Sequence, residues 1–271
     1  ASPCINALAE AAAWIAQKTG RELVLLQVLD YYPASYHLGE ISGVIGFESN
    51  AMLLKELAEL EQKQSELALD YSNNLLKHIS EMIVEKYGIT PRQIQAKGDF
   101  LEQSFSVLNE DDIVVIGRVG EKSAERNKAL GSNVENFIRG ANCTVMTVGE
   151  HFKAPTRFIF AYEYSPTCIK MMKRIAQSDL LKLLQCHLLY VGDHPEVLNE
   201  PADFLTSAGL DVVVEYRYGD VAENILDYQR EHGIQLIVLG AFSHSKIHQF
   251  FLGSITTNIF RNSTVPLLVA K

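Results

Sequence analysis

The chain has 271 residues, of which 47% are hydrophobic and 21% charged, and it carries a net charge of −9. These values fit a globular protein with two cores, and the acidic charge argues against nucleic acid or an anionic membrane as the main partner. No apolar run reaches the roughly 20 residues that cross a bilayer, and the first residues form no basic and apolar leader, so we expect a cytoplasmic protein.

The first half of the chain alternates helix and strand patterns. In chain order we expect helix 6–18, strand 22–29, loop 31–50, one long helix or two over 51–87, strand 89–97, a helix that carries Leu101, Phe105 and Leu108, strand 113–116, helix 131–139 and strand 144–148. Ser2-Pro3 and Gly98-Asp99 mark the starts of two of these helices. The run 113–116 is apolar throughout, which predicts a strand buried on both faces.

The second half repeats this order of elements. In chain order we expect strand 157–162, turn 163–166, helix 167–184, strand 187–191, a short helix over 195–208, a helix after Gly219-Asp220, a buried strand that ends at Gly240, a helix opened by Gly253, and strand 264–269. Alternating helices and apolar strands predict parallel sheets with helices on both faces.

The two halves also match residue by residue. The matching pairs are Gly117 with Gly240 at an offset of 123, and Gly131 with Gly253, Asn136 with Asn258 and Arg139 with Arg261 at an offset of 122 each. A period this long indicates a domain duplicated in tandem, because each copy is large enough to bury its own core. We predict one domain over residues 1–150 and a second over residues 154–271.

The first copy lacks a counterpart for one strand of the second. Ser165-Pro166 matches Ser2-Pro3, and strand 157–162 stands before the former pair but has no equivalent before the latter. A parallel sheet without a central strand leaves backbone groups unpaired, at about 1 to 3 kcal/mol each. We therefore expect the first strand of domain 1 to be missing from the chain.

Glycines stand where parallel sheets bind ligands. Gly117 and Gly240 each end a buried strand, where the chain turns and a ligand can approach the backbone. Gly131 and Gly253 each precede a serine and open a helix, whose free amides and positive dipole end favour a phosphate. The pattern predicts a phosphate-binding loop. The alternative is that glycine and serine serve only the turn from strand to helix.

This glycine array resembles that of the universal stress protein family in its tandem form. The array is a glycine, two residues, a glycine, nine residues, and a glycine before Ser or Thr, with a strand before it and a helix and a last strand after it. The resemblance covers the entire chain. It implies two flavodoxin-like α/β domains, each with a doubly wound five-stranded parallel sheet, packed as a pseudo-dimer. The last strands, 144–148 and 264–269, would pair and so cover two exposed edges.

The resemblance also implies a ligand. The family contains members that bind ATP and members that do not, and binding members have an aspartate at the end of the first strand. Here the second copy has Glu163 at that position and Ser243 in place of the second glycine, and the first copy has ten residues between Gly120 and Gly131. The implied site for ATP or AMP, with Mg²⁺, consists of Gly117, Gly120, Gly131, Ser132, Glu163, Gly240, Ser243, Gly253 and Ser254. In the charged loop of the first copy, Lys122, Arg126 or Lys128 could reach a triphosphate.

No other pattern predicts catalysis or a metal site. His244 and His248 have the spacing of one helix face but lack a third ligand, and Cys186-His187 fits an apolar strand better than a nucleophile with its base. The four cysteines are scattered without a CxxC pair, which is typical of reduced core thiols. We expect at most slow ATP hydrolysis and no fast enzyme.

The expected function is a stress response in which the protein senses or stores an adenine nucleotide. The alternative is a non-nucleotide-binding protein with degenerate glycine loops that acts through protein partners or binds a small apolar ligand, and a homodimer is also open. The long helix 51–87 bears on this choice. Its apolar side is expected to be core, yet its length in one copy only leaves room for a partner; these residues are Leu53, Leu57, Leu60, Leu67 and Leu75.

Overall fold

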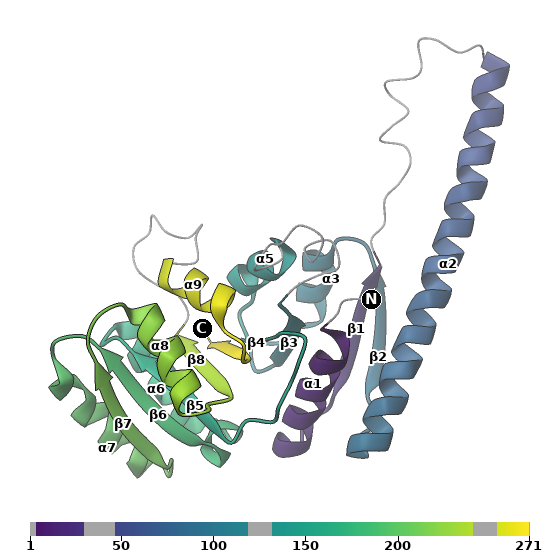
Figure 1. The fold of residues 1–271 in the computed structure, drawn as a ribbon. Helices are drawn as coiled ribbons and strands as arrows, with labels where there is room; N and C mark the ends of the chain where they lie inside the picture. The colour runs from purple at the N-terminus through teal and green to yellow at the C-terminus, as the bar shows by residue number, and fades with distance from the viewer. Residues whose placement is uncertain (1–3, 30–46, 119–131, 241–253, 271) are drawn as a thin grey trace. The chain divides into compact units, whose positions relative to one another are not determined.

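The computed structural model describes residues 4–29, 47–118, 132–240 and 254–270 (Figure 1). The chain forms two compact units, one of Ala1–Arg21 with Leu108–Lys271 and the other of Glu22–Val107. Ser2-Pro3 and most of the expected loop 31–50 lie outside the described residues. The predicted domains, 1–150 and 154–271, follow the sequence repeat and not these units, and their boundaries stay a prediction.

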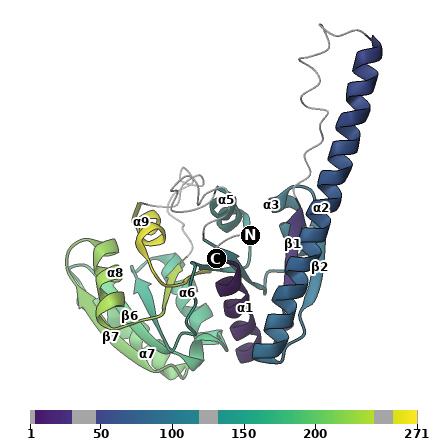
Figure 2. The same cartoon turned by 45° about the vertical axis from the view of Figure 1, so that its right-hand side comes forward.

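The smaller unit consists of two parallel strands beside a long helix. Its elements are β1 (Val24–Leu29), α2 (Phe47–Tyr87), β2 (Arg92–Lys97) and α3 (Phe100–Val107). β1 and β2 pair in parallel, with Val24 opposite Arg92. α2 is one continuous helix of 41 residues, which decides between one helix and two. Figure 2 shows α2 running alongside the two strands.

Local sequence explains how this unit is held together. Asp99 caps α3, because its Oδ1 accepts hydrogen bonds from the backbone amides of Leu101 and Glu102, each at 2.9 Å. The C-terminal half of α2 contributes three apolar side chains that are at most 7% exposed: Leu76, Ile79 and Ile83. This burial fixes one face of α2 against the strands.

The larger unit is built on a seven-stranded sheet with the order β3-β4-β9-β8-β5-β6-β7. Its strands are β3 (Ile113–Gly117), β4 (Thr144–Val148), β5 (Arg157–Tyr162), β6 (Gln185–Val191), β7 (Val212–Arg217), β8 (Leu236–Gly240) and β9 (Leu267–Ala270). Its helices are α1 (Ile5–Thr19), α5 (Ser132–Gly140), α6 (Pro166–Gln177), η3 (Leu181–Leu183), η4 (Pro195–Leu198), α7 (Asn199–Ser207), α8 (Val221–Glu231) and α9 (Ser254–Asn262). The second repeat places its first strand, β5, in the middle of its five, with the order reversing at β5, which is a doubly wound arrangement, so the predicted doubly wound α/β fold class is confirmed.

Helices cover both faces of this sheet. On one face Phe158, Phe160 and Leu188 belong to a core that also contains apolar side chains of α1, α6 and α7. On the other face α8 packs against β5 and β6, and its Tyr228 contacts His187 of β6. Alternate strand residues therefore serve two cores, as expected for strands buried on both faces.

The two repeats meet through their last strands, as predicted. β4 and β9 pair antiparallel, with Val145 opposite Val269, Met146 opposite Leu268 and Thr147 opposite Leu267. Met146 and Leu268 are equivalent residues at the repeat offset of 122, so the pairing is symmetric about them. The pairing covers two strand edges that would otherwise be open.

Two expectations were wrong. β3 is not buried on both faces: all five of its residues are half-buried, because β3 is an edge strand of the seven-stranded sheet. The helix predicted over 167–184 ends at Gln177, because Ser178 turns the chain and its Oγ accepts a hydrogen bond from the amide of Leu181 at 3.2 Å, which starts η3.

Candidate functional site

The carboxyl ends of β5 and β8 lie side by side. The strands are parallel neighbours, and Phe160 is opposite Val238. Continuing this register two residues places Tyr162 opposite Gly240, the half-buried last residue of β8. Glu163 follows Tyr162 directly, so the predicted acidic residue and the first predicted glycine of the second repeat lie at one edge of the sheet. They belong to neighbouring strands, which are about 5 Å apart.

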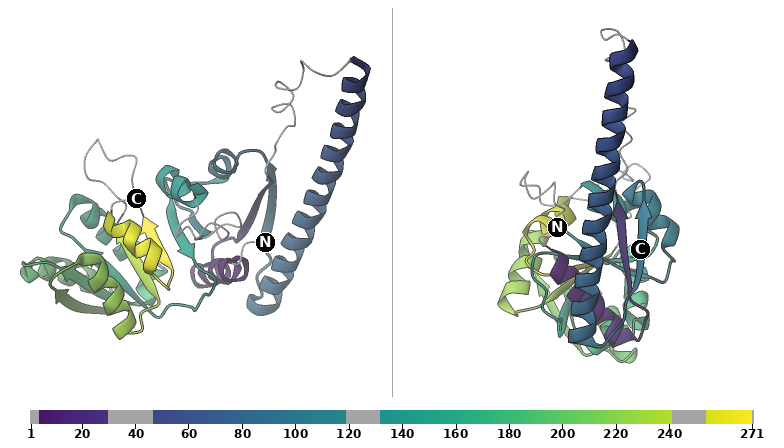
Figure 3. Two further views of the ribbon diagram at one scale, coloured as in Figure 1. Left: turned by 45° about the horizontal axis from the view of Figure 1, so that its top comes forward. Right: turned by 90° about the vertical axis from the view of Figure 1, so that its right-hand side faces the viewer.

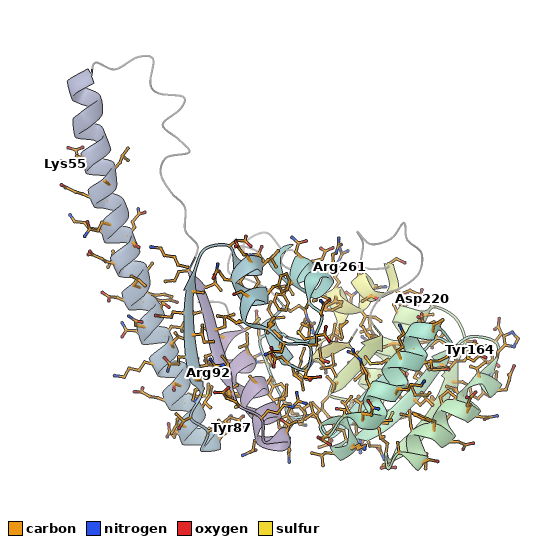
Figure 4. All side chains as sticks on the ribbon, turned by 180° about the vertical axis from the view of Figure 1, so that it is seen from behind. Lys55, Tyr87, Arg92, Tyr164, Asp220 and Arg261 are labelled. Atoms are coloured by element: carbon orange, nitrogen blue, oxygen red, sulfur yellow. The ribbon has the colours of Figure 1, made fainter. Side chains whose placement is uncertain are left out.

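Glu163 is held by the turn into α6. Its carboxylate accepts a hydrogen bond from the Ser165 hydroxyl at 2.9 Å, and the same hydroxyl oxygen accepts from the Cys168 amide at 3.1 Å. Ser165 is 4% exposed and is the N-cap of α6, with Pro166 next to it, as predicted. Tyr164 has a φ of +51°, which lets the chain turn between the strand and the cap (Figure 4). Glu163 itself stays exposed, so a ligand can reach it.

The predicted helix after Gly253 is α9, which follows β8 in the chain. α9 begins at Ser254, whose side chain is exposed, and packs on the protein through buried Thr256, Ile259 and Phe260. The amides of a first helical turn have no partners within the helix, and the dipole there favours an anion. Ser243 and Gly253 lie outside the described residues.

The first repeat offers a less complete arrangement. Gly117 ends β3 and Ser132 begins α5, whereas Gly120 and Gly131 lie outside the described residues. β3 pairs with β4 alone in the described part of the chain, so no described neighbouring strand supplies an acid in the place of Glu163.

Arg118, directly after Gly117, was not singled out from the sequence. The residue is 7% exposed, and its guanidinium donates to the backbone carbonyls of Ser263 and Val265, the latter at 2.7 Å. Burial lowers the pKa of Arg118 to about 10, which still leaves the side chain charged at neutral pH. A basic residue inside a glycine loop suggests a phosphate contact, but this one anchors the first repeat to the segment before β9 in the second.

Among the remaining sequence candidates, the described pair Cys186 and His187 does not form a nucleophile with its base. Cys186 and His187 are consecutive in β6 and therefore point to opposite faces of the sheet. Burial raises the pKa of the Cys186 thiol, while His187 Nδ1 lies 2.8 Å from the hydroxyl of Tyr228. The pair is thus a core thiol and a hydrogen-bonded core histidine. His244, His248 and the basic residues Lys122, Arg126 and Lys128 lie outside the described residues.

Metal clusters and membrane-spanning helices are both absent from the part of the chain that the structure describes. The described residues contain no group of three or more His, Cys, Asp or Glu side chains able to hold a metal ion. Nor does any of the described helices have the length and apolar character needed to span a membrane. All four cysteines are buried, as expected for core thiols.

The expectation for the long helix was wrong in part. Leu60 and Leu67 were expected to be core, but they are 56% and 69% exposed. Leu57 and Leu75 are half-buried. Apolar residues at helical spacing identify a face, but they do not tell whether the same chain covers it.

Comparisons with known proteins agree with this fold. The model of the universal stress protein family matches residues 202–271. A universal stress protein from Synechocystis is 30% identical over 268 residues, which cover 96% of this chain and 93% of that protein. The crystal structure of a universal stress protein from Archaeoglobus fulgidus is similar with a TM-score of 0.72 at 18% identity, over 100% of this chain and 95% of that one.

A putative universal stress protein from Pseudomonas aeruginosa is similar with a TM-score of 0.55 at 12% identity, over 94% of each chain. The structural similarities support the fold, and the Synechocystis relative spans nearly the full length of both sequences. Together with the duplicated glycine arrays, this similarity supports a stress-response role. The chain belongs to the universal stress protein family.

Proposed function

We propose that the protein binds an adenine nucleotide as part of its stress response and that the second repeat carries the site. The observation behind the proposal is that Glu163 and Gly240 follow or end the neighbouring parallel strands β5 and β8 at their carboxyl ends, and that α9 is the next described helix after β8. Ligands of open α/β sheets bind at this edge, beside the strand where the order reverses. β5 is that strand in the second repeat.

Each part has a chemical task in this proposal. The exposed carboxylate of Glu163 accepts hydrogen bonds from hydroxyl or amino groups of the nucleoside. Gly240 lets the ligand approach the backbone. The first amides of α9 and the hydroxyl of Ser254 donate to phosphate oxygens, and Gly253 and Ser243 belong to the proposed site by sequence. Mg²⁺ would arrive with a triphosphate and neutralise part of its charge.

The proposed role is sensing and not fast turnover. Activating a water molecule for attack on a phosphate needs a well-placed base. Glu163 is the acidic residue that the proposal places on the ligand, and its carboxylate already accepts from Ser165. Its position next to the nucleoside end of the proposed ligand also leaves it far from the terminal phosphate at α9.

The test is a calorimetric titration of the full chain with ATP and with AMP. We expect affinity near the micromolar range and a loss of roughly tenfold in Gly253→Ala, because a Cβ at the start of α9 displaces the phosphate from about one hydrogen bond. Gly131→Ala makes the same change in the first repeat and serves as the matched control, with unchanged affinity. Circular dichroism of both variants should match the parent chain.

Glu163→Gln separates the nucleoside end from the phosphate end. It keeps the size of the side chain and weakens ATP and AMP binding equally, whereas Gly253→Ala should weaken ATP more. No heat of binding for the parent chain, or equal losses in Gly253→Ala and Gly131→Ala, would overturn the proposal.

A second candidate function is a protein that acts through its surface without a nucleotide. The exposed leucines of α2 favour it. Mass spectrometry of small molecules extracted from the freshly purified chain separates the two. An adenine nucleotide in the extract supports the proposed site, and an empty protein that ignores ATP supports the interaction role.

A further inference from the structure

The N-terminal half of α2 has an exposed apolar stripe. Leu60, Leu67 and Tyr71 are 56%, 69% and 52% exposed. Among the described side chains from 55 to 71, only Leu57 and Ser65 are even half-buried. Figure 3 shows this half of the helix continuing past the ends of β1 and β2. Large side chains at such exposure favour a partner that covers them.

The stripe is not the face by which α2 packs on its own unit. That face is marked by Ser72, whose Oγ accepts from Gln95 at 2.9 Å, and by Ser65, whose Oγ accepts from Lys97 at 3.3 Å. With 3.6 residues per turn, the three exposed side chains of the stripe lie within about 40° of one another, and the two serines lie roughly 120° or more away from Leu60. α2 therefore has two distinct faces. One packs against the strands of its unit, and the other carries the exposed stripe.

The spacing of the stripe is that of a coiled coil. Leu57, Leu60, Gln64, Leu67 and Tyr71 follow one another at intervals of three, four, three and four residues. This is the a and d pattern of a heptad repeat, whose partner is another helix of the same pattern. In the second repeat the corresponding helix, α7, has nine residues and cannot provide such a seam. The fitting partner is α2 of a second copy.

The charged residues beside the stripe favour an antiparallel pairing of the two α2 helices. Lys63 and Asp70 both occupy the g position of their heptads, and both are exposed. In an antiparallel pair g faces g, so with Leu60 opposite Tyr71 each Lys63 meets Asp70 of the other helix, and two attractive contacts form. In a parallel pair Lys63 would instead face Ala68, and neither contact would form.

We infer that two copies of this chain associate through the stripe of α2 as an antiparallel two-helix coiled coil. The seam is short and contains Gln64, a polar residue that lowers stability but fixes register. The dimer therefore dissociates at low protein concentration, and it is weakened by salt because its charged pairs are exposed.

Sedimentation analysis of the full chain over a range of concentrations tests the association. The parent chain should shift from monomer to dimer, and Leu67→Lys should weaken the dimer by about a hundredfold, because a leucine is lost from the seam in both copies. Leu69→Gln is the matched control: Leu69 is also exposed, at 39%, but it lies on the opposite side of the helix. That variant should dimerise like the parent chain.

Charge exchange tests the orientation. Lys63→Glu and Asp70→Lys should each weaken the dimer roughly three- to tenfold, because each turns two attractive contacts into repulsive ones. The double variant should recover the parent affinity, and the two single variants mixed together should form a heterodimer. A parallel coil would show no recovery.

Either of two results overturns the inference. One is a parent chain that stays monomeric up to about 100 μM, where a weak coiled coil would already form. The other is a dimer that Leu67→Lys leaves intact. All substituted side chains are exposed, so circular dichroism should show unchanged folds, and neither result bears on nucleotide binding.

Discussion

The second repeat holds its five strands in one sheet, whereas the first repeat divides its strands between two compact units. In the second repeat β5 pairs with β6 on one side and β8 on the other. No strand in the described part of the first repeat pairs with β1 and β3 in this way. The difference shows in burial: β8 is buried over its first four residues, while β3 is half-buried throughout. The central strand thus decides whether its neighbours are core.

The helices after the second strand of each repeat differ as much. α7 has nine residues, and α2 has 41. The C-terminal part of α2 is sufficient to cover its unit, since Leu76, Ile79 and Ile83 are buried there. The N-terminal part is additional surface, so we expect the first repeat to mediate association and the second to bind the ligand.

Substitution of two equivalent valines tests the difference in packing between β8 and β3, and it has the largest expected effect on stability. Val238 of β8 and Val115 of β3 are equivalent at the repeat offset of 123, but Val238 is 0% exposed and Val115 is half-buried. Val238→Ala should lower the free energy of unfolding by about 2 to 3 kcal/mol and Val115→Ala by about 1 kcal/mol, since only the former leaves a closed cavity. Urea denaturation of both variants measures this. Equal losses would mean that β3 is as well packed as β8.

A smaller loss of stability is expected at the carboxyl end of β6, where Gly192 lies close to the side chain of Tyr190. A Cβ on Gly192 would lie 2.5 Å from the hydroxyl oxygen of Tyr190. Gly192→Ala should therefore cost about 1 to 2 kcal/mol of stability. Aligning the Leu-Leu pairs of β1 and β6 places Gln27 and Leu29 of the first repeat at these positions.

The first repeat thus suggests the compensating change. In a Tyr190→Gln background, Gly192→Ala should cost less than about 0.5 kcal/mol, because the ring that blocks it is gone. Urea midpoints of the four proteins complete the cycle. If the losses of unfolding free energy in the two single variants add up to that of the double variant, the Tyr190 ring does not clash with the new Cβ.

The smallest effect concerns pH. The pKa of buried His187 is lowered, first by burial and then by His232 and Arg157, while Asp211 opposes the shift. His187 therefore takes up a proton more readily in the unfolded chain than in the folded one. Its contribution to the free energy of unfolding is complete above about pH 6.5 and is lost as pH falls through that value. Unfolding free energies at about pH 7.5 and pH 5.5 should show this loss.

The first repeat again supplies the control variant. The same alignment places Val24 at the position of His187. His187→Val should have a flatter pH dependence than the parent chain, although it leaves the hydroxyl of Tyr228 without its present partner. If the unfolding free energy of His187→Val changes as much between the two pH values as that of the parent chain, groups other than His187 cause the pH dependence.

The sequence was sufficient for the fold because two independent patterns agreed. The offset between Gly117 and Gly240 identified the duplication, and the apolar runs between helices identified parallel strands. The pairing of β4 with β9 followed from the family resemblance. The half-burial of β3 was missed, because a continuous apolar run reports composition and not the number of neighbouring strands.

The candidate site was predictable in part. Gly240 was predicted from the end of an apolar strand and Glu163 from the family resemblance, and both lie at the carboxyl ends of neighbouring parallel strands. Arg118 was missed, because its partners are the carbonyls of Ser263 and Val265, about 145 residues away in sequence. The exposure of Leu67 was also missed, because helical periodicity cannot tell a core from a surface that another molecule covers.

The antiparallel contact between β4 and β9 has a consequence for how the strand ends of the two repeats are arranged. The parallel strands of the first repeat point one way along the sheet, and those of the second point the other way. Their carboxyl ends, the kind of strand end at which ligands of open α/β sheets bind, therefore lie at opposite edges of the sheet. The two repeats are joined by the hydrogen bonds of this strand pair and by those of Arg118 to Ser263 and Val265, so a change of register between β4 and β9 would alter how the repeats are coupled.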